Sequence, residues 1–185
     1  MSVRSESSGP YAVTFRAYEH VKFVAVLRGR FDLQLEGAVH ATSLRQGDCY
    51  MLTNGAEYRI FNADVPETDA AALYAANRGI DGVVRWGDGP ADTVTIGSRA
   101  SFIPQTVDWL RHRLPPFIRI PEGTATALRF RATLTLLCED PEGAAGSAFV
   151  ADRFVGILIA EVLRHLLAVD DVQLPQWFSE FAPDV

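Results

Sequence analysis

The sequence predicts an α+β fold in which an antiparallel β-sandwich or barrel comes first and a pair of helices follows. Short β-prone runs separated by glycine, asparagine and aspartate turns occupy the first half of the chain. Two longer stretches with helical spacing of apolar residues occupy the second half. The chain has 185 residues, 48% of them hydrophobic and 22% charged, which is enough apolar material for one well-buried core.

The first predicted strands lie between Val21 and Leu35, in the run VKFVAVLRGRFDLQL. Arg28, Gly29 and Arg30 mark a turn between two strands, and apolar residues alternate with polar ones after it. That period of two is typical of a half-buried strand. A further turn at 46–48 precedes the run CYMLT, and Asn54-Gly55 before EYRIF predicts a hairpin, since both residues tolerate positive φ.

The middle of the chain is harder to interpret. Residues 63–89 contain several glycines, and the stretch LYAANRG within them fits either a strand or a helical turn. We predict a strand over Thr93–Ile96. A short helix is predicted from Thr106 to Leu114, because Pro115 and Pro116 would end it.

Two helices are predicted in the second half. The first runs from Ala125 to Glu139 with Thr124 as its N-cap, and the second runs from Ser147 to about Val169. The second helix carries more apolar side chains than one packing face can bury. We therefore expect a symmetric dimer contact on it; the alternative is that segments of the same chain, around Trp177 and Phe178, cover the remaining apolar surface. The residues expected at the dimer contact are Phe154, Ile157, Leu158, Val162 and Leu163.

Charge and composition exclude several classes of function. The net charge is −6, and the arginines are scattered among acidic residues, so this chain lacks the basic face that DNA binding requires. No apolar run reaches membrane-spanning length and no signal peptide is apparent, so we expect a cytoplasmic protein without membrane contact. Cys49 and Cys138 are expected to be buried free thiols.

Four segments occur in a characteristic order: FDLQLEG, LRQGDCYMLTNGAEYRI, LPPFIRIP and FVADRFVGILIAEVLRHLL. Together they resemble the N-terminal cupin domain of AraC-type transcription regulators. The resemblance implies a jelly-roll barrel that binds a small-molecule effector, over residues 1–120. It also implies a helical dimerisation segment and the start of a linker over 121–185. Both parts would belong to one structural domain, and the protein would form a homodimer. DNA would be bound only by a C-terminal helix-turn-helix region that this chain lacks.

Metal-dependent cupin enzymes are the main rival interpretation. They typically hold their metal with several histidines from neighbouring hairpins, and the position that resembles one of these, three residues after Gly55, is Tyr58. The histidines of this chain, His20, His40, His112 and His165, are far apart in sequence. We therefore expect no metal, no cofactor and no enzymatic activity. A metal-dependent enzyme and a dimerisation module without a ligand stay open as alternatives.

Polar residues on an otherwise apolar inner face are the best indicators of a ligand. Tyr58 has the strongest argument because it replaces an inward-pointing cupin ligand, although it could equally well fill the barrel as a packing residue. Arg28 precedes a turn glycine, where solvated arginines are common, and Trp86 could close the mouth of the barrel or cover its core. The expected ligand-binding residues are His20, Lys22, Arg28, Tyr58, Tyr18 and Trp86, with Arg16 a weaker candidate.

Overall fold

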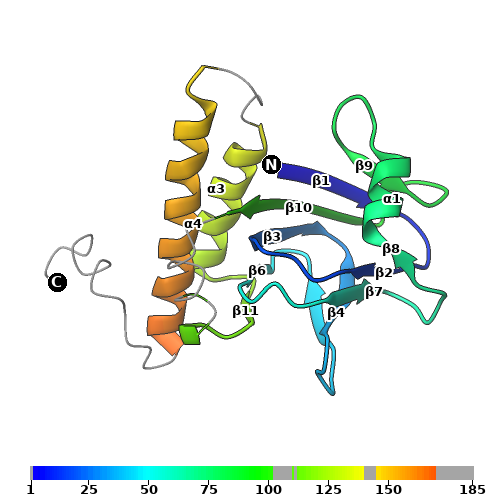
Figure 1. Ribbon diagram of the computed structural model, residues 1–185, viewed down its shortest axis with the longest axis horizontal. Helices are drawn as coiled ribbons and strands as arrows, with labels where there is room; N and C mark the ends of the chain where they lie inside the picture. Colours follow the sequence, from blue (N-terminus) through cyan, green and yellow to red (C-terminus); the bar gives the residue numbers. More distant parts are fainter. Residues whose placement is uncertain (1, 102–109, 111, 140–144, 170–185) are drawn as a thin grey trace, which may run out of the picture.

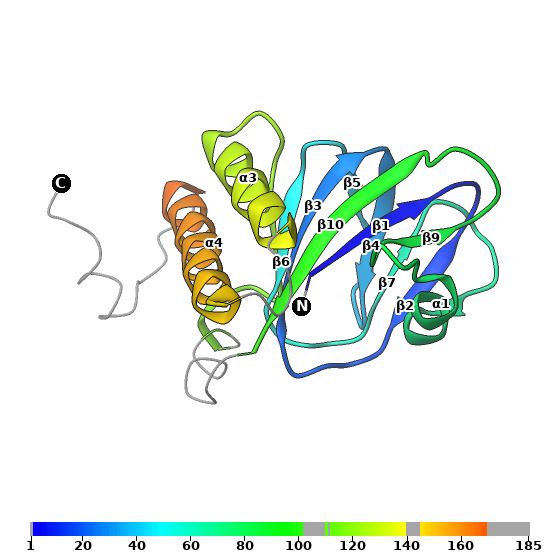
Figure 2. The same ribbon diagram turned by 90° about the horizontal axis from the view of Figure 1, so that it is seen from above.

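The computed structural model describes residues 2–101, 110, 112–139 and 145–169. Two β-sheets face each other, a pair of long helices covers the outer face of one sheet, and a short helix lies at the opposite end of the molecule (Figures 1 and 2). This α+β arrangement of a jelly-roll-like sandwich followed by two helices is the predicted fold class.

The larger sheet has six strands in the order β11-β6-β3-β10-β1-β9. All neighbouring pairs are antiparallel except β1 with β9, which is parallel. The strands are β1 (Ser2–Ser7), β3 (Val21–Arg28), β6 (Cys49–Leu52), β9 (Val84–Trp86), β10 (Thr93–Ala100) and β11 (Phe117–Ile120).

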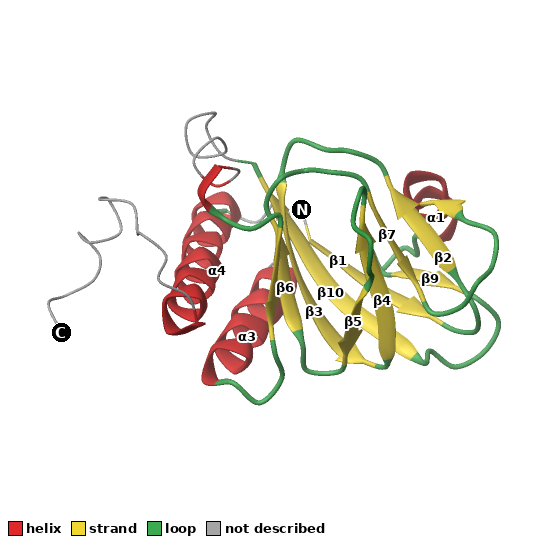
Figure 3. Ribbon diagram, turned by 90° about the horizontal axis from the view of Figure 1, so that it is seen from below, coloured by secondary structure: helices red, strands yellow, loops and turns green. Residues whose placement is uncertain are grey.

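The smaller sheet has five strands in the order β5-β4-β7-β2-β8, and it lies across from the larger sheet (Figure 3). Its pairs are antiparallel except β2 with β8. The strands are β2 (Ala12–Phe15), β4 (Arg30–Leu35), β5 (Thr42–Arg45), β7 (Tyr58–Phe61) and β8 (Thr68–Asp69).

The larger sheet is buried on both faces, so its central strands divide their side chains between two hydrophobic clusters. On β6, Cys49 and Met51 pack toward the helices, whereas Tyr50 and Leu52 belong to the cluster between the sheets. This alternation follows from the two-residue period of a strand. It explains why all four residues of β6 are buried and why the run CYML lacks the polar alternation of a half-buried strand.

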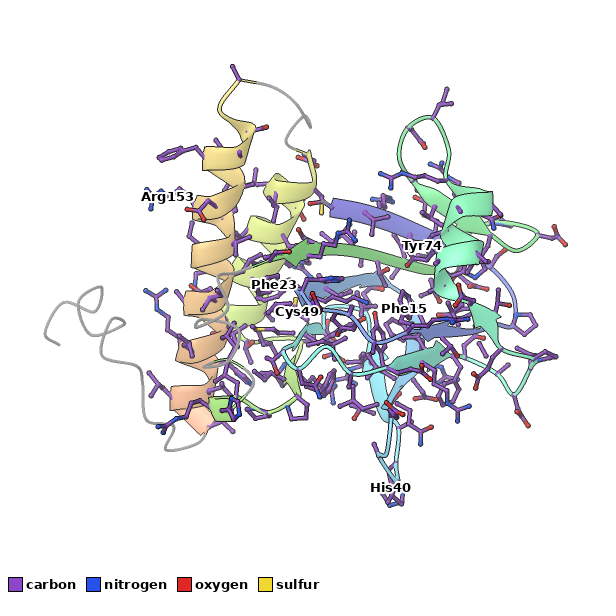
Figure 4. The ribbon with its side chains drawn as sticks, in the orientation of Figure 1. Phe15, Phe23, His40, Cys49, Tyr74 and Arg153 are labelled. Carbon is purple, nitrogen blue, oxygen red and sulfur yellow. The ribbon has the colours of Figure 1, made fainter. Side chains whose placement is uncertain are left out.

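The helices α3 (Ala125–Glu139) and α4 (Ser147–Val169) begin and end as predicted. Thr124 caps α3, because its Oγ1 accepts a hydrogen bond of 3.0 Å from the amide of Ala127. Their buried faces pack against the larger sheet and each other, and Figure 4 shows Phe23 and Cys49 on the sheet side of this layer. Phe130, Leu134, Leu158 and Leu163 are the largest helical contributions to this core.

The ambiguous stretch LYAANRG forms mainly helix. Helix α1 (Ala70–Asn77) starts at Asp69, whose carboxylate accepts a hydrogen bond of 3.1 Å from the amide of Ala72. The helix contacts β2 and β8 of the smaller sheet and β9 of the larger one. It therefore bridges the two sheets at the end of the sandwich opposite α3 and α4 (Figure 2).

Of the two predicted forms of the β-region, sandwich or barrel, the structure has the sandwich, and one prediction about a turn within it was wrong. The sheets do not close into a barrel, because the edge strands β9 and β8 pair with only one neighbour each and α1 lies between them. The Asn54-Gly55 segment is not a hairpin turn, since β6 and β7 belong to different sheets and this segment carries the chain from one to the other. The short helix predicted over Thr106–Leu114 lies mostly outside the described residues.

Candidate functional site

A cavity of about 560 Å³ lies between the two sheets and reaches α1. Strands of both sheets contribute its walls, and Ala70, Ala71 and Tyr74 of α1 line the side where the sandwich is open. Figure 4 shows Phe15 and Tyr74 at this end, away from the α3–α4 layer. Apolar and aromatic side chains form about half of the lining, and most of the remainder are polar or charged, among them Lys22, Arg78 and Arg99; an apolar cavity with polar groups on its wall is the usual character of a small-molecule site.

Lys22 is placed in this cavity by the alternation of β3. Phe23 and Ala25 belong to the helix-side core, so Lys22 and Val24, on the opposite face of the strand, point between the sheets and line the cavity. Three aromatic rings surround its ammonium group. The Nζ atom lies 3.8 Å from the ring centroid of Tyr18, 4.6 Å from that of Tyr58 and 4.7 Å from that of Phe15.

The charge on Lys22 is poorly compensated. Its Nζ donates one hydrogen bond of 3.1 Å to the Tyr58 hydroxyl, and no carboxylate of the described residues forms an ion pair with it. Burial, and to a lesser degree the nearby Arg99 guanidinium, lower the pKa of Lys22 to about 7. The three ring faces favour the charged form and oppose this shift, but each such contact is worth only about 0.5–2 kcal/mol.

His20 lies beside this group, with its ring centroid 4.5 Å from that of Tyr18. Burial and the positive charge of Lys22 lower the pKa of His20 to about 4. The imidazole is therefore neutral at neutral pH, so it can act as both a hydrogen-bond donor and an acceptor toward a ligand.

Two tyrosines form the aromatic floor of the cavity. Tyr58 is buried on β7 and its ring stacks on that of Phe15 with a centroid separation of 4.6 Å, while Tyr50 reaches the same space from β6. Burial raises the pKa of both Tyr50 and Tyr58 well above the ordinary value. Both hydroxyls stay protonated at neutral pH and can donate hydrogen bonds.

A polar edge lies near α1. Arg16 pairs with Asp69 across 2.8 Å, and the hydroxyls of Ser5 and Tyr74 hydrogen-bond at 3.1 Å. These four residues line the cavity as well. Since Arg16 is largely exposed, this pair marks the side of the cavity that is open to solvent.

The structure brings together part of the set expected from sequence. His20, Lys22, Tyr58 and the weaker candidate Arg16 line the cavity, and Tyr18 contacts both Lys22 and His20. Arg28 does not belong to the site, because it lies at the exposed end of β3, beside the Gly29 turn. Trp86 is also outside the lining; its ring packs edge-on against Tyr11 at 5.8 Å and belongs to the inter-sheet core.

Sequence reasoning missed several lining residues, among them Tyr50, Tyr74 and Arg99. Tyr50 had a usable signal, because strand alternation places it opposite Cys49 and Met51. Tyr74 had none, since its segment could not be assigned to helix or strand. The cavity also contains the single lysine of a chain with sixteen arginines, which is a signal visible in the composition alone.

Among the described residues, no group of three or more histidine, cysteine, aspartate or glutamate side chains is arranged to hold a metal ion. Of the four histidines only His20 lines the cavity, and His40 lies in the exposed loop between β4 and β5 (Figure 4). The predictions of no metal and no cofactor stay predictions. No helix within the described part of the chain is long and apolar enough to cross a membrane.

The structure is a jelly-roll-like sandwich with a cavity between its sheets, followed by two helices. A family model described as "Cupin" matches residues 1–168, and the chain belongs to this family. It is 30% identical over 188 residues to an AraC-like transcription regulator of Streptomyces antibioticus, and 31% identical over 189 residues to one of Streptomyces lividans. Both matches cover 100% of the chain, which spans only 61% and 60% of the lengths of these curated relatives.

Solved structures with a related arrangement include the AraC-like transcriptional activator CuxR, with a TM-score of 0.47 and 12% identity over 85% of this chain and 46% of CuxR. Another is the unsaturated fatty acid-bound wild-type ToxT of Vibrio cholerae, with a TM-score of 0.47 and 9% identity over 89% of this chain and 53% of ToxT. The recognition made from sequence, a cupin domain of the kind found in AraC-type regulators, agrees with the family match and with the names of the two curated relatives.

Proposed function

We propose that this chain is the effector-sensing and dimerisation part of an AraC-type transcription regulator, and that it has no enzymatic role. The cavity around Lys22 is the observation that carries the proposal. A structural core would bury an apolar residue at this position, because burying a weakly compensated lysine costs folding free energy. DNA binding would belong to a helix-turn-helix region of a longer regulator, since the net charge of this chain is −6 and phosphate binding requires positive charge.

The described structure suggests how the two proposed tasks are divided. The sandwich, within residues 1–120, would hold the effector, and the segment 121–185 would carry the dimer contact. Helices α3 and α4 pack on the outer face of the sheet whose inner face lines the cavity. A ligand that displaces β3 or β6 would therefore also shift α3 and α4, because the same strands contact both the cavity and the helices.

Effector binding can be tested by a thermal and chemical denaturation screen against a library of small metabolites. A ligand present at about 100 times its Kd should increase the free energy of unfolding by about 2.7 kcal/mol. The variant Val24→Trp places a large side chain on the cavity wall and should abolish that gain. Val39→Trp is the matched control, because Val39 is 84% exposed in the loop between β4 and β5. Undiminished stabilisation of Val24→Trp would show that the ligand binds elsewhere.

The dimer surface needs revision from the sequence-based expectation. Leu158, Val162 and Leu163 are completely buried against the sheet and α3 within one chain, so they are not available to a partner. Ile157 is exposed and Phe154 is half-buried on α4. We therefore place the proposed contact on the outer face of α4. Its exposed apolar side chains are Phe149, Val150, Ile157, Leu167 and Val169.

Sedimentation of Ile157→Glu tests this surface. We expect the unmodified chain to be a dimer at tens of micromolar concentrations and the variant to be a folded monomer, because a charge there cannot be desolvated in a symmetric contact. Val39→Glu is the control: Val39 is exposed in the loop between β4 and β5, outside α4, and should leave the dimer intact. A monomeric unmodified chain, or a dimeric Ile157→Glu variant, would contradict the proposed contact.

A further inference from the structure

Lys22 is chemically unique in this protein. The chain contains sixteen arginines and one lysine, and that lysine lies in the cavity between the sheets. An arginine at this position would supply a permanent positive charge and more hydrogen-bond donors. Apart from the histidines, all other basic side chains of the chain are arginines. The property that lysine has and arginine lacks is a primary amine that can lose its proton and react as a nucleophile.

The surroundings of the amine favour that reactivity. Apolar and aromatic walls desolvate the group, no described carboxylate pairs with it, and the Arg99 side chain on the neighbouring strand β10 lines the same cavity. Burial and the Arg99 charge lower the pKa of Lys22 to about 7, so a large fraction of the amine is neutral at neutral pH. An ordinary lysine, with a pKa of about 10.4, is almost entirely protonated there.

We propose that Lys22 captures a carbonyl ligand, an aldehyde with an aromatic or apolar body, as a reversible imine. The inference rests on the proposed effector-binding function and names the chemical class of the ligand. The aromatic rings of Phe15, Tyr18 and Tyr58 surround the position where the new bond would form, and the cavity volume of about 560 Å³ suits a small organic molecule.

The reaction needs no oxidant or reductant. The lone pair of the neutral Nζ adds to the carbonyl carbon as the C=O π bond breaks; nitrogen then loses one of its two protons and the oxygen gains one, which gives a neutral carbinolamine. Loss of the nitrogen-bound hydrogen and of the hydroxyl group as water then gives the C=N bond. The net change is one amine and one aldehyde converted to one imine and one water, and hydrolysis reverses it.

Neighbouring groups are placed to assist these proton movements. The Tyr58 hydroxyl lies 3.1 Å from Nζ and is held in its protonated form by burial, so it can donate a hydrogen bond to the oxygen that develops beside the amine. The neutral His20 imidazole borders the same cavity and can accept a hydrogen bond from the hydroxyl group of the carbinolamine. A protonated imine would keep a positive charge over the same three rings, which now hold the ammonium group.

Reductive trapping tests the proposal. The folded protein is incubated at pH 7 with benzaldehyde and sodium cyanoborohydride, and peptide mapping by mass spectrometry follows benzylation of Lys22. The α-amino group at the N-terminus is the only other primary amine of the chain and serves as an internal reference. We expect Lys22 to react at least tenfold faster in the folded protein than in the same protein unfolded in urea, because unfolding restores the ordinary pKa.

The variant Arg30→Lys provides a matched lysine. Arg30 is exposed at the start of β4, outside the cavity, so the amine introduced there reports the reactivity of an ordinary surface lysine in the same digest. Lys22 should react at least tenfold faster than this reference. In Lys22→Arg only the N-terminal amine should be benzylated, and circular dichroism checks that this variant is folded.

Equal or slower labelling of Lys22, relative to either the unfolded chain or the amine of Arg30→Lys, overturns the inference. The outcome is separable from the proposed function. If a metabolite stabilises the protein and Val24→Trp abolishes that effect while Lys22 shows no enhanced labelling, the site binds a ligand without covalent capture. Preferential labelling of Lys22, blocked in Val24→Trp, supports covalent capture at this site.

Discussion

Replacing Asp48 by alanine is expected to lower the free energy of unfolding by about 3–5 kcal/mol, measured by urea denaturation. Asp48 is completely buried at the turn between β5 and β6. Its carboxylate pairs with the Arg119 guanidinium at 2.8 Å, and it accepts hydrogen bonds from the amides of Arg45 at 3.0 Å and Glu122 at 2.9 Å. Alanine would leave a guanidinium and two amides without their acceptor.

The large effect follows from the position of Asp48 as well as from its contacts. It connects the β5–β6 turn to β11 and to the segment that leads into α3, so its loss loosens both the larger sheet and the attachment of the helices. Asp48→Asn should cost less, because the amide keeps one acceptor oxygen. Asp64→Asn, at an exposed aspartate, should change stability by no more than about 0.5 kcal/mol. An Asp48→Ala variant as stable as this control would refute the interpretation.

Stability is expected to increase with pH above 7 because of Lys22. Burial lowers the pKa of Lys22 in the folded protein to about 7, below its ordinary value of 10.5. Between these values the unfolded chain binds one more proton than the folded chain, so the free energy of unfolding increases with pH by up to about 1.4 kcal/mol per unit. Below pH 7 both states are protonated, and the cost of burying the charge is present in full.

The comparison with Lys22→Met isolates this contribution by urea denaturation. The methionine variant should be more stable than the unmodified protein at pH 6, and its advantage should shrink steadily between pH 7 and pH 9. The Lys22 charge also lowers the pKa of His20, so only the change above pH 7, where His20 is neutral in both proteins, is assigned to Lys22; Tyr18, Tyr58 and Arg99 are common to both proteins. Lys22→Arg stays charged and should show a pH-independent difference from Lys22→Met. A constant difference between the unmodified protein and Lys22→Met would show that the Lys22 pKa is not lowered.

Local sequence patterns predicted the elements whose signals come from adjacent residues. The start of α3 follows from the Thr124 cap, and the extents of α3 and α4 follow from the helical spacing of their apolar residues. The strand over 30–35 follows from its alternation, because Phe31 and Leu33 are buried and the polar residues between them are not. These features were predictable because caps, turns and periodicity act within a few residues of one another.

Long-range pairing was decided only in the tertiary structure. Asn54-Gly55 has the composition of a hairpin turn, yet β6 pairs with β3 and β11 whereas β7 pairs with β2 and β4. Strand β6 was also hard to recognise from sequence, because the larger sheet is buried on both faces. Helices α3 and α4 cover its outer side, so β6 lacks the alternation of polar and apolar residues that marks a half-buried strand. The parallel pairs β1–β9 and β2–β8 are likewise made between segments far apart in the sequence.

By itself, the sequence determined the α+β class, the two long helices, the acidic net charge and the cupin resemblance, because composition and local periodicity carry these properties. It also pointed to His20, Lys22 and Tyr58. Only the tertiary structure decided that these three residues meet in one cavity with Phe15 and Tyr74 and that Arg28 and Trp86 do not. The tertiary structure also decided that Leu158 is buried within one chain and is therefore not available for a dimer contact. The physical reason is that a side chain's burial, and with it the pKa of Lys22, depends on which distant segments pack around it.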